Sequence, residues 1–276
     1  MLARLLLLIY RRIMSHPPKI FDSRARARLR ARAVAHYGDF AFLKEAMAEE
    51  IAARIATLER HFALALDLGS HDGRLAARLP ADHVVRTDLV SAFAPAPLGV
   101  LCHEDRLPFA DASFDLIVSA ASLGGVDDLP RALVDIRRAL KPGGYFFAAF
   151  IGGESLPEYR MALLGAESDV RGGVSARIAP TVSAEHAPAL LQRAGFVDPV
   201  ADLETHRVRY DDIHALWRDL RGSGEGNYLA ARPRTPMPRA LVREAAARFA
   251  AHADADGRVA VQVQILHLAG RAPAMP

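Results

Sequence analysis

The chain has 276 residues, of which 51% are hydrophobic and 24% are charged, a composition typical of a soluble globular enzyme. This length accommodates one large α/β domain or one domain with an insertion, and the formal net charge of +3 argues against electrostatic binding of nucleic acid. Cys102 is the single cysteine, which excludes an intramolecular disulfide and is typical of a reducing compartment.

The first 21 residues contain no acidic side chain and several basic ones, Arg4, Arg11, Arg12 and Lys19. Their apolar run LLLLIY is too short to span a bilayer, which needs about 20 residues, and no small-residue cleavage site follows it. Three interpretations remain open: a translated extension upstream of a start at Met14, a short surface helix, or an organellar targeting segment. We therefore treat residues 1–19 as an extension outside the fold.

An arginine-rich segment, SRARARLRARAVAH, occupies residues 23–36. Arginine recurs there at every second position, which spreads the charge over much of a helix, at Arg24, Arg26, Arg28, Arg30 and Arg32. The segment is either a solvated basic helix or an arm that closes over an anionic substrate or an acidic partner. Asp39 is then predicted to cap a second helix, because apolar residues recur near helical spacing at Leu43, Met47, Ile51, Ile55 and Leu58.

The pattern then changes to an alternation of strands and helices. Strand-like runs are predicted at residues 62–66, 83–87, 98–102, 114–119 and 145–150, and helices at 74–79 and 129–140. Short apolar strands that alternate with helices indicate a mainly parallel sheet covered on both faces. In LKPGGYFFAAF, the proline and the two glycines end a helix and reverse the chain into the next strand.

The second half of the chain is predicted to add helices to this sheet. Residues 152–195 read as mostly helical, and further helices are predicted around 211–220 and 239–252, separated by the glycine-rich RGSGEGN. The last predicted strand, RVAVQVQILHLAG, alternates cleanly, with Val259, Val261, Val263 and Ile265 on one face.

The stretch LALDLGSHDGRLAARLP has the order of a cofactor loop: a strand, a tight turn with Gly69 and Gly73, and a predicted helix. Asp88 lies 19 residues beyond Gly69 at the end of the second strand, near the distance at which a carboxylate accepts ribose hydroxyls. Asp67 adds a carboxylate that suits a cationic ligand better than a pyrophosphate. The loop therefore favours an adenosyl sulfonium over a dinucleotide; the alternative is an α/β domain whose turns merely contain Asp and Gly.

With these elements placed, the chain resembles the class I S-adenosylmethionine-dependent methyltransferases. The resemblance rests on LALDLGSHDG, TDL, LPFADASFDLIVSAASL and DLPRALVDIRRALKPGGYF. Over about residues 20–270, the segments IFDSRARARLRARA, IGGESLPEYR, LLQRAGF and WRDLRGSGEGN resemble more narrowly the arginine-hydroxylating assembly factors of respiratory complex I and their bacterial relatives. The malonyl-carrier-protein methyltransferases of biotin synthesis are also similar.

The resemblance implies a Rossmann-like α/β fold with a mainly parallel seven-stranded sheet, helices on both faces, and extra helices at the N-terminus and after strand five. It implies an N-terminal helical arm or lid at 20–60, a cofactor-binding domain at 61–270 with a helical insertion at about 152–195, and a tail at 271–276. It also implies S-adenosyl-L-methionine as the cofactor.

This chain departs from the family pattern around one pocket. His71 replaces the middle glycine of the loop, and its side chain is expected to turn outward while its backbone N–H stays available. His103 stands where the family often has an aspartate for the adenine amino group, so either His103 or Glu104 is expected to take that role. Gly124 and Gly125 replace a histidine and an aromatic residue, since the family's SLHWV reads SLGGV here.

The predicted cofactor-binding residues are Asp67, Gly69, Ser70, His71, Gly73, Asp88, Leu89, His103, Glu104 and Ser119. No catalytic residue is predicted, because methyl transfer needs chiefly alignment of the reacting atoms. No metal site is predicted either: the scattered histidines read as surface or satisfied residues, namely His36, His61, His83 and His186. Asp254 and Asp256 read as part of a turn, because Ile265 occupies the place where a calcium loop needs its glutamate.

The favoured function is a cofactor-binding enzyme that modifies a protein substrate, with support of complex I assembly by arginine hydroxylation implied by the resemblance. A methyltransferase that acts on a small or carrier-bound carboxylate is one alternative, and a non-catalytic assembly chaperone with a degenerate cofactor site is another. The expected partners are a protein substrate such as a complex I subunit or a small-molecule methyl acceptor, with no nucleic acid and at most peripheral membrane association. A bacterial cytoplasm is the expected location, with the mitochondrial matrix as the alternative.

Overall fold

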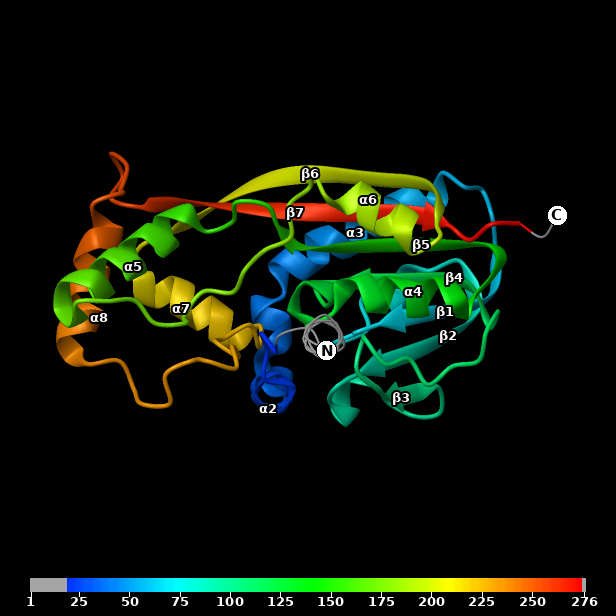
Figure 1. Ribbon diagram of the computed structural model, residues 1–276, viewed down its shortest axis with the longest axis horizontal. Helices are drawn as coiled ribbons and strands as arrows, with labels where there is room; N and C mark the ends of the chain where they lie inside the picture. The colour runs from blue at the N-terminus through cyan, green and yellow to red at the C-terminus, as the bar shows by residue number, and fades with distance from the viewer. Residues whose placement is uncertain (1–18, 275–276) are drawn as a thin grey trace, which may run out of the picture.

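A single twisted sheet forms the backbone of the molecule in the computed structural model, which describes residues 19–274 (Figure 1). Its strands are β1 (Phe62–Leu68), β2 (Ala81–Asp88), β3 (Gly99–Leu101), β4 (Phe114–Ala120), β5 (Leu140–Gly152), β6 (Val197–Tyr210) and β7 (Val259–Arg271). They lie in the order β3-β2-β1-β4-β5-β7-β6. The first five strands are parallel, while β7 runs antiparallel to both β5 and β6. The predicted seven-stranded, mainly parallel sheet is confirmed.

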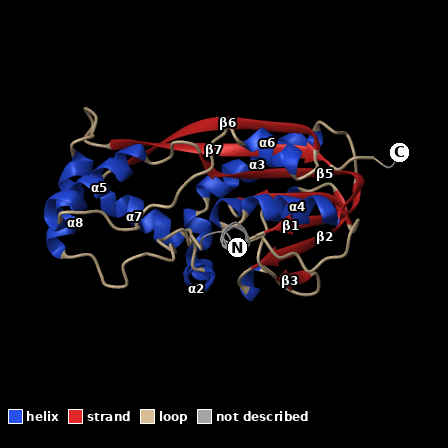
Figure 2. Cartoon of the chain, in the orientation of Figure 1, coloured by secondary structure: helices blue, strands red, loops and turns tan. Residues whose placement is uncertain are grey.

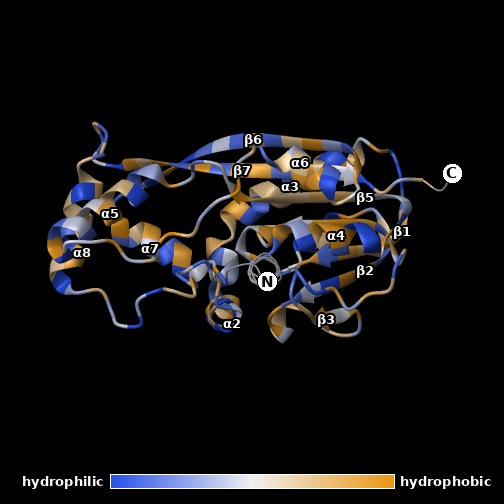
Figure 3. Ribbon diagram, viewed as in Figure 1, coloured by the Kyte–Doolittle hydropathy of each residue, from blue (hydrophilic) through white to orange (hydrophobic). Residues whose placement is uncertain are grey.

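Helices cover both faces of the parallel strands. The α3 helix (Phe42–Ala56) packs on one face through Met47, Ile51 and Ile55. The α4 (Leu129–Ala139) and α6 (Ala187–Arg193) helices cover the other face. In α4, apolar and polar positions alternate around the helix (Figure 3), and the Asp128 carboxylate caps its first turn by accepting from the Arg131 N–H.

A helical lobe extends from one end of the sheet, where β6 and β7 continue beyond the parallel strands (Figure 2). It consists of α5 (Pro157–Arg171), α7 (Ile213–Gly222) and α8 (Arg239–Ala250). A core of its own joins these helices to the start of β7, with Phe249, Leu241 and Val261 fully buried. The predicted inward face of the last strand is confirmed, because Val259, Val261, Val263 and Ile265 are all buried.

The N-terminal arm consists of α2 (Ser23–Ala33) and the 3₁₀ helix η1 (Val34–Phe40), which lead into α3. Asp22 caps α2 by accepting from the Ala25 N–H, 3.0 Å away. Asp39 was expected to cap the next helix, but it lies inside η1, and Ala41 precedes α3 without a side-chain cap. This prediction was wrong because the chain stays helical from the end of α2 to residue 40.

Two further elements differ from the sequence prediction. No α-helix forms at 74–79; only the 3₁₀ helix η2 (Ala76–Arg78) does, because the Gly73 turn and Pro80 leave too few residues for a stable helical nucleus. The β6 strand, which lies at one edge of the sheet, had no counterpart among the strand-like runs, since it mixes exposed and half-buried residues without a clear apolar pattern.

The predicted extension at residues 1–19, its targeting interpretations and a start at Met14 fall almost wholly outside the described residues, as does the end of the predicted tail. Between residues 19 and 274 no helix is long and apolar enough to cross a membrane.

Candidate cofactor cleft and adjoining chamber

The loop after β1 forms a tight turn at the carboxyl edge of the sheet. Gly69, His71 and Gly73 all have positive φ values, of 72°, 49° and 82°. Arg86 on β2 braces the loop from behind, because its guanidinium donates to the His71 carbonyl at 2.8 Å and to the Ser70 hydroxyl at 3.2 Å. The turn therefore keeps the left-handed backbone typical of glycine loops, even though a histidine occupies its middle.

His71 turns its side chain inward, which corrects the expectation that it faces outward. The residue is 1% exposed, and its ring stacks on Tyr37 with centroids 5.0 Å apart. Burial and the nearby cations Arg30 and Lys44 hold the pKa of His71 well below its usual range, so the ring is neutral. Its Nδ1 atom lies 2.8 Å from both the Lys44 Nζ atom and the Gly69 carbonyl oxygen, and the position of the proton decides which partner it engages.

A buried lysine and a buried aspartate face the same loop. Lys44 on α3 donates to the Ser70 carbonyl at 2.9 Å and to the Gly69 carbonyl at 3.2 Å, and burial lowers the pKa of its amine to about 8. Asp67 at the end of β1 is fully buried, and neither carboxylate oxygen has a hydrogen-bond partner among residues 19–274. Burial raises the pKa of Asp67 to about 6 despite the attraction of Lys44 and Arg86. An orphaned buried carboxylate is a suitable partner for a cationic ligand.

Asp88, the predicted ribose partner at the end of β2, is engaged by the protein itself. The Arg30 guanidinium from α2 donates to its Oδ2 atom at 2.9 Å, and both side chains are completely buried. The His71 N–H lies 3.2 Å from the same oxygen, and the Val90 N–H donates to Oδ1 at 3.2 Å. Both carboxylate oxygens that would accept ribose hydroxyls are therefore already hydrogen-bonded.

Glu104 occupies the adjoining part of the cleft, whereas His103 is exposed. The Arg26 guanidinium from α2 donates to Glu104 at 2.9 Å, and the Ser122 hydroxyl donates to it as well. Arg30 lies 3.9 Å away. These groups outweigh the effect of burial and lower the pKa of Glu104 to about 2.

The structure brings six of the predicted cofactor residues together around this cleft: Asp67, Gly69, Ser70, His71, Asp88 and Glu104. Gly73 instead lies against the Arg86 guanidinium. Leu89 is half-buried, and it lines neither of the two cavities that are described below. The Ser119 hydroxyl donates to the Leu68 carbonyl at 2.8 Å, so its polar group is used between β4 and β1.

Sequence reasoning missed several side chains that fill the cleft, namely Arg26, Tyr37, Lys44 and Ser122. Arg26 and Arg30 are four residues apart, a spacing that places both on one face of a helix, whereas Arg28 and Arg32 are exposed. Arg28 and Arg32 have the same four-residue spacing, so the spacing alone does not predict which pair turns inward. The Arg26–Arg30 pair closes over acidic groups of the protein's own cofactor cleft, whereas the arm was expected to close over an anionic substrate or an acidic partner, which stays a prediction.

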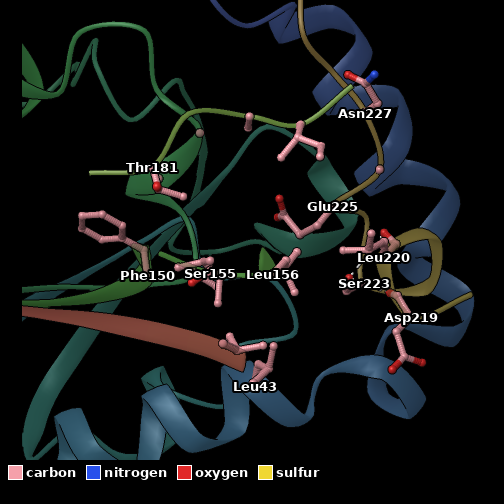
Figure 4. Close-up of a pocket in the computed structure, with 18 of the residues that line it drawn as sticks. Leu43, Phe150, Ser155, Leu156, Thr181, Asp219, Leu220, Ser223, Glu225 and Asn227 are labelled. Atoms are coloured by element: carbon pink, nitrogen blue, oxygen red, sulfur yellow. Dashed lines mark hydrogen bonds between the residues drawn. The ribbon is translucent and has the colours of Figure 1, made fainter. Parts of the chain in front are cut away.

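A mostly apolar chamber adjoins the cleft and extends toward the helical lobe. Its volume is about 250 Å³, and His71, Lys44 and Gly124 lie on its wall toward the cofactor loop. Figure 4 shows Phe150, Ser155 and Leu156 on one side and the segment with Asp219, Ser223, Glu225 and Asn227 on the other. Besides Lys44 and His71, the wall contains two arginines and two carboxylates, Arg160, Arg177, Asp219 and Glu225. A second hollow of about 30 Å³ is lined by Arg26, His103 and Glu104 among others.

The sheet order, the glycine loop and the acidic residues at the ends of β1 and β2 define a class I S-adenosylmethionine-dependent methyltransferase fold. Residues 66–148 match the family model of the methyltransferase domain. The chain belongs to this family, and it is similar to the arginine-hydroxylase NDUFAF5 and to the malonyl-[acyl-carrier protein] O-methyltransferases.

Two relatives and one solved structure document this similarity. The mitochondrial arginine-hydroxylase NDUFAF5 of Mus musculus is 35% identical over 243 residues, which cover 84% of this chain and 70% of that protein. The malonyl-[acyl-carrier protein] O-methyltransferase of Halorhodospira halophila is 31% identical, over 84% of this chain and 81% of its own length. The crystal structure of the YcgJ protein from Bacillus subtilis matches with a TM-score of 0.57 at 13% identity, and covers 82% of this chain and 99% of that one.

S-adenosyl-L-methionine is the cofactor that this family membership indicates. The residues of the cleft fit it chemically: the orphaned Asp67 suits a cation, and Asp88 and Glu104 are the acceptors expected for ribose and adenine. Two of these three carboxylates, however, are paired with Arg26 and Arg30 from α2.

Proposed function

We propose that this protein modifies the side chain of a protein substrate, with arginine as the acceptor, in support of respiratory complex I assembly. The observation that carries this proposal is the make-up of the chamber beside the cofactor loop. An apolar wall that includes Phe150 and Leu156 suits the aliphatic part of an arginine, while the carboxylates of Asp219 and Glu225 suit its guanidinium (Figure 4). Similarity to the arginine-hydroxylase NDUFAF5 over most of the chain supports the same acceptor.

Glu225 is the carboxylate that we expect to select the substrate. It is half-buried in the glycine-rich segment after α7, and it accepts a hydrogen bond from the Tyr228 hydroxyl at 3.1 Å. No cation lies within ion-pair distance of it among residues 19–274. A carboxylate with spare acceptor positions on the wall of an apolar chamber attracts a guanidinium more strongly than a neutral group.

The cofactor would be held by Asp67, Asp88 and Glu104. When bound, it supplies an adenosyl sulfonium whose methyl carbon is electrophilic. The chain's own contribution is to exclude water with the apolar wall and to hold the acceptor in a fixed orientation, a requirement that methyl transfer from the cofactor and hydroxylation of an arginine share.

Methylation of a carboxylate is the second candidate, and Arg160 favours it. Arg160 lines the same chamber and is half-buried, yet its side chain has no hydrogen bond or ion pair among the described residues. Arg177, by contrast, is paired with the buried Glu167 at 2.6 Å. A free guanidinium in a chamber suits a carboxylate substrate, as the similarity to malonyl-[acyl-carrier protein] O-methyltransferase also suggests.

The filled cofactor cleft favours a third candidate, a non-catalytic assembly chaperone that keeps the fold without the reaction. This candidate predicts that complex I assembles normally when the cofactor loop is destroyed. A strain that carries only the Gly69→Arg/Asp88→Ala variant tests it, provided that the variant protein accumulates to the wild-type level.

The decisive experiment compares arginine-containing peptides from a deletion strain with those from strains complemented with wild-type protein, Glu225→Gln or Glu185→Gln. Glu185 is exposed and lies outside the chamber, so it serves as the matched control. We expect an arginine that carries one added oxygen atom in the wild type and in Glu185→Gln, its loss in the deletion strain, and strong reduction in Glu225→Gln. The oxygen would come from dioxygen, with two electrons from an external reductant and the second oxygen atom released as water.

Unaltered arginine modification in the deletion strain would contradict the proposal. In that case purified protein is incubated with labelled S-adenosylmethionine and malonyl-carrier protein, with Arg160→Gln as the comparison. Label transfer to the carboxylate that depends on Arg160 would establish the second candidate.

A further inference from the structure

Helix α2 inserts two buried guanidinium groups into the cofactor cleft. Arg26 is 3% exposed and Arg30 is 0% exposed, although both belong to a helix whose other arginines face solvent. Arg30 pairs with Asp88 and Arg26 pairs with Glu104, each at 2.9 Å. The contacts of α2 therefore fall on the same carboxylates that the family's cofactor needs.

Ser122 closes the space above the glycine loop. Its hydroxyl lies 2.0 Å from the position that a Cβ atom on Gly69 would occupy, so nothing else fits against Gly69 in this arrangement. Arg26 and Arg30 hold Ser122 there, because Arg30 donates to its hydroxyl at 3.0 Å and Arg26 donates to its carbonyl at 2.7 Å. The block on the loop is thus tied to the position of α2.

The buried charges of the cleft already balance one another, which disfavours entry of a cationic ligand. The buried charged residues of the cleft are three bases and three acids, namely Arg26, Arg30, Lys44, Asp67, Asp88 and Glu104. A sulfonium ligand that entered beside all three bases would leave an uncompensated charge in a buried site, which is strongly unfavourable. Departure of the two arginines frees their carboxylates for the ligand.

The closed arrangement leaves polar atoms unsatisfied, which makes opening less costly. The Nε atoms of Arg26 and Arg30 are buried without a hydrogen-bond partner, as are both oxygens of Asp67. Most buried polar atoms in folded proteins are paired, so these four atoms weaken the closed state relative to one in which water or ligand reaches them.

We propose that α2 is a displaceable plug: S-adenosylmethionine and the Arg26–Arg30 pair compete for Asp88 and Glu104, and the cofactor binds only after α2 leaves the cleft. The departures of this chain from its family fit the plug. A Cβ atom on Gly125 would lie 2.9 Å from the Arg26 Nε atom and 2.7 Å from the Tyr228 hydroxyl, so the aromatic residue of the family's SLHWV has no room while Arg26 is docked. This inference concerns cofactor binding and does not depend on which acceptor is modified.

The test measures S-adenosylhomocysteine affinity of the full chain by isothermal titration. In Arg26→Gln/Arg30→Gln the plug loses its charge, so the open fraction rises and the ligand should bind about 10–100-fold more tightly than to the wild type. The matched control is Arg28→Gln/Arg32→Gln, which removes two exposed arginines from the same helix and should stay within about twofold of the wild type. Equal or weaker binding by Arg26→Gln/Arg30→Gln, or no binding by either protein, overturns the proposal.

Hydrogen exchange of the wild-type protein provides a second measurement that does not require the variant to fold. Saturating S-adenosylhomocysteine should accelerate exchange of the α2 amides, because the ligand and the docked helix exclude each other. Unchanged or slower exchange in α2 would mean that the ligand binds beneath a closed arm, and it would overturn the proposal regardless of any result on arginine modification.

Discussion

The cofactor cleft and the adjoining chamber differ in how they are filled. The cleft contains buried cations and carboxylates that pair with one another, and its hydrogen-bonding groups are largely satisfied from within the chain. The chamber beside it is lined mainly by apolar side chains, and the charged groups of Arg160, Asp219 and Glu225 on its wall have no ion-pair partner between residues 19 and 274. The charged groups of the cleft thus pair with one another, while the chamber presents unpaired charged groups to a ligand.

This difference separates two requirements that a group-transfer enzyme must meet. An acceptor needs only a route into the chamber, whereas the cofactor must replace contacts that already exist in the cleft. A ligand that competes with an intramolecular contact binds with an affinity reduced by the fraction of molecules that are open. Cofactor affinity in this chain is therefore governed by the stability of the α2 contacts as well as by the glycine loop.

The largest effect is expected when the buried pair in the cleft is broken. In Asp88→Ala, Arg30 loses its carboxylate partner and stays in a site with 0% exposure, so the free energy of unfolding should fall by about 3–5 kcal/mol. Urea denaturation measures it, with Asp82→Ala as the control, since that aspartate lies on the same strand and its side chain is 61% exposed. The control should change stability by less than about 1 kcal/mol.

A loss below about 1 kcal/mol in Asp88→Ala would change the comparison between the two sites. It would mean that Arg30 is already solvated and that α2 is mostly open in solution. Asp88→Ala is also the natural control for cofactor binding, so its stability must be known before a loss of binding is attributed to a missing ribose contact.

Substitution of Asp67 is expected to raise the free energy of unfolding, whereas substitution of Asp88 lowers it. Its folded pKa of about 6 lies above the ordinary value of 3.8, so the unfolded chain releases this proton first as the pH rises. This group therefore lowers stability progressively between about pH 4 and pH 6, and Asp67→Asn should be more stable than the wild type by about 2–3 kcal/mol at pH 7. The gain should vanish below about pH 3, where the wild-type carboxyl is protonated in both states.

Urea denaturation of both proteins at a series of pH values measures this gain, with Asp82→Asn as the control. The same substitution should weaken S-adenosylmethionine binding, because the orphaned carboxylate is the group that suits a cation. Higher stability with lower affinity is the expected signature of a residue kept for a ligand. A pH-independent difference between the variant and the wild type would refute the assigned pKa shift.

Much of the fold could be predicted from the sequence, because strand burial leaves a local pattern. The alternation at Val259, Val261 and Val263 was enough to place β7, and the glycine turn after β1 was enough to place the cofactor loop. The β6 strand and the short helix η2 were not predicted, since β6 mixes exposed and half-buried residues without an apolar pattern and a short helix depends on its neighbours for stability.

Only the part of the candidate site that the sheet and its loop contribute was predicted from the sequence. The carboxylates and the loop follow from the ends of the strands, and their positions agree with the predicted cleft at Asp67, Asp88 and Glu104. Arg26 and Lys44 come from helices far away in the sequence, and nothing local distinguishes a buried arginine from an exposed one at Arg28. Which arginines turn inward depends on tertiary contacts with Ser122 and the carboxylates, and a single sequence does not contain that information.

The smallest effect tests the fit of the plug directly. In Gly125→Ala the new methyl group meets the Tyr228 hydroxyl at 2.7 Å and the Arg26 Nε atom at 2.9 Å, so one of the two side chains must shift. The expected loss of stability is about 1 kcal/mol, because only the ends of two side chains need to move. Gly38→Ala is the control, since Gly38 has ordinary backbone angles and nothing within 4 Å of its added Cβ.

If α2 is a plug, this small loss is accompanied by tighter binding of S-adenosylhomocysteine, because the methyl group disfavours only the closed state. A loss of both stability and affinity would instead assign Gly125 to the ligand-binding surface.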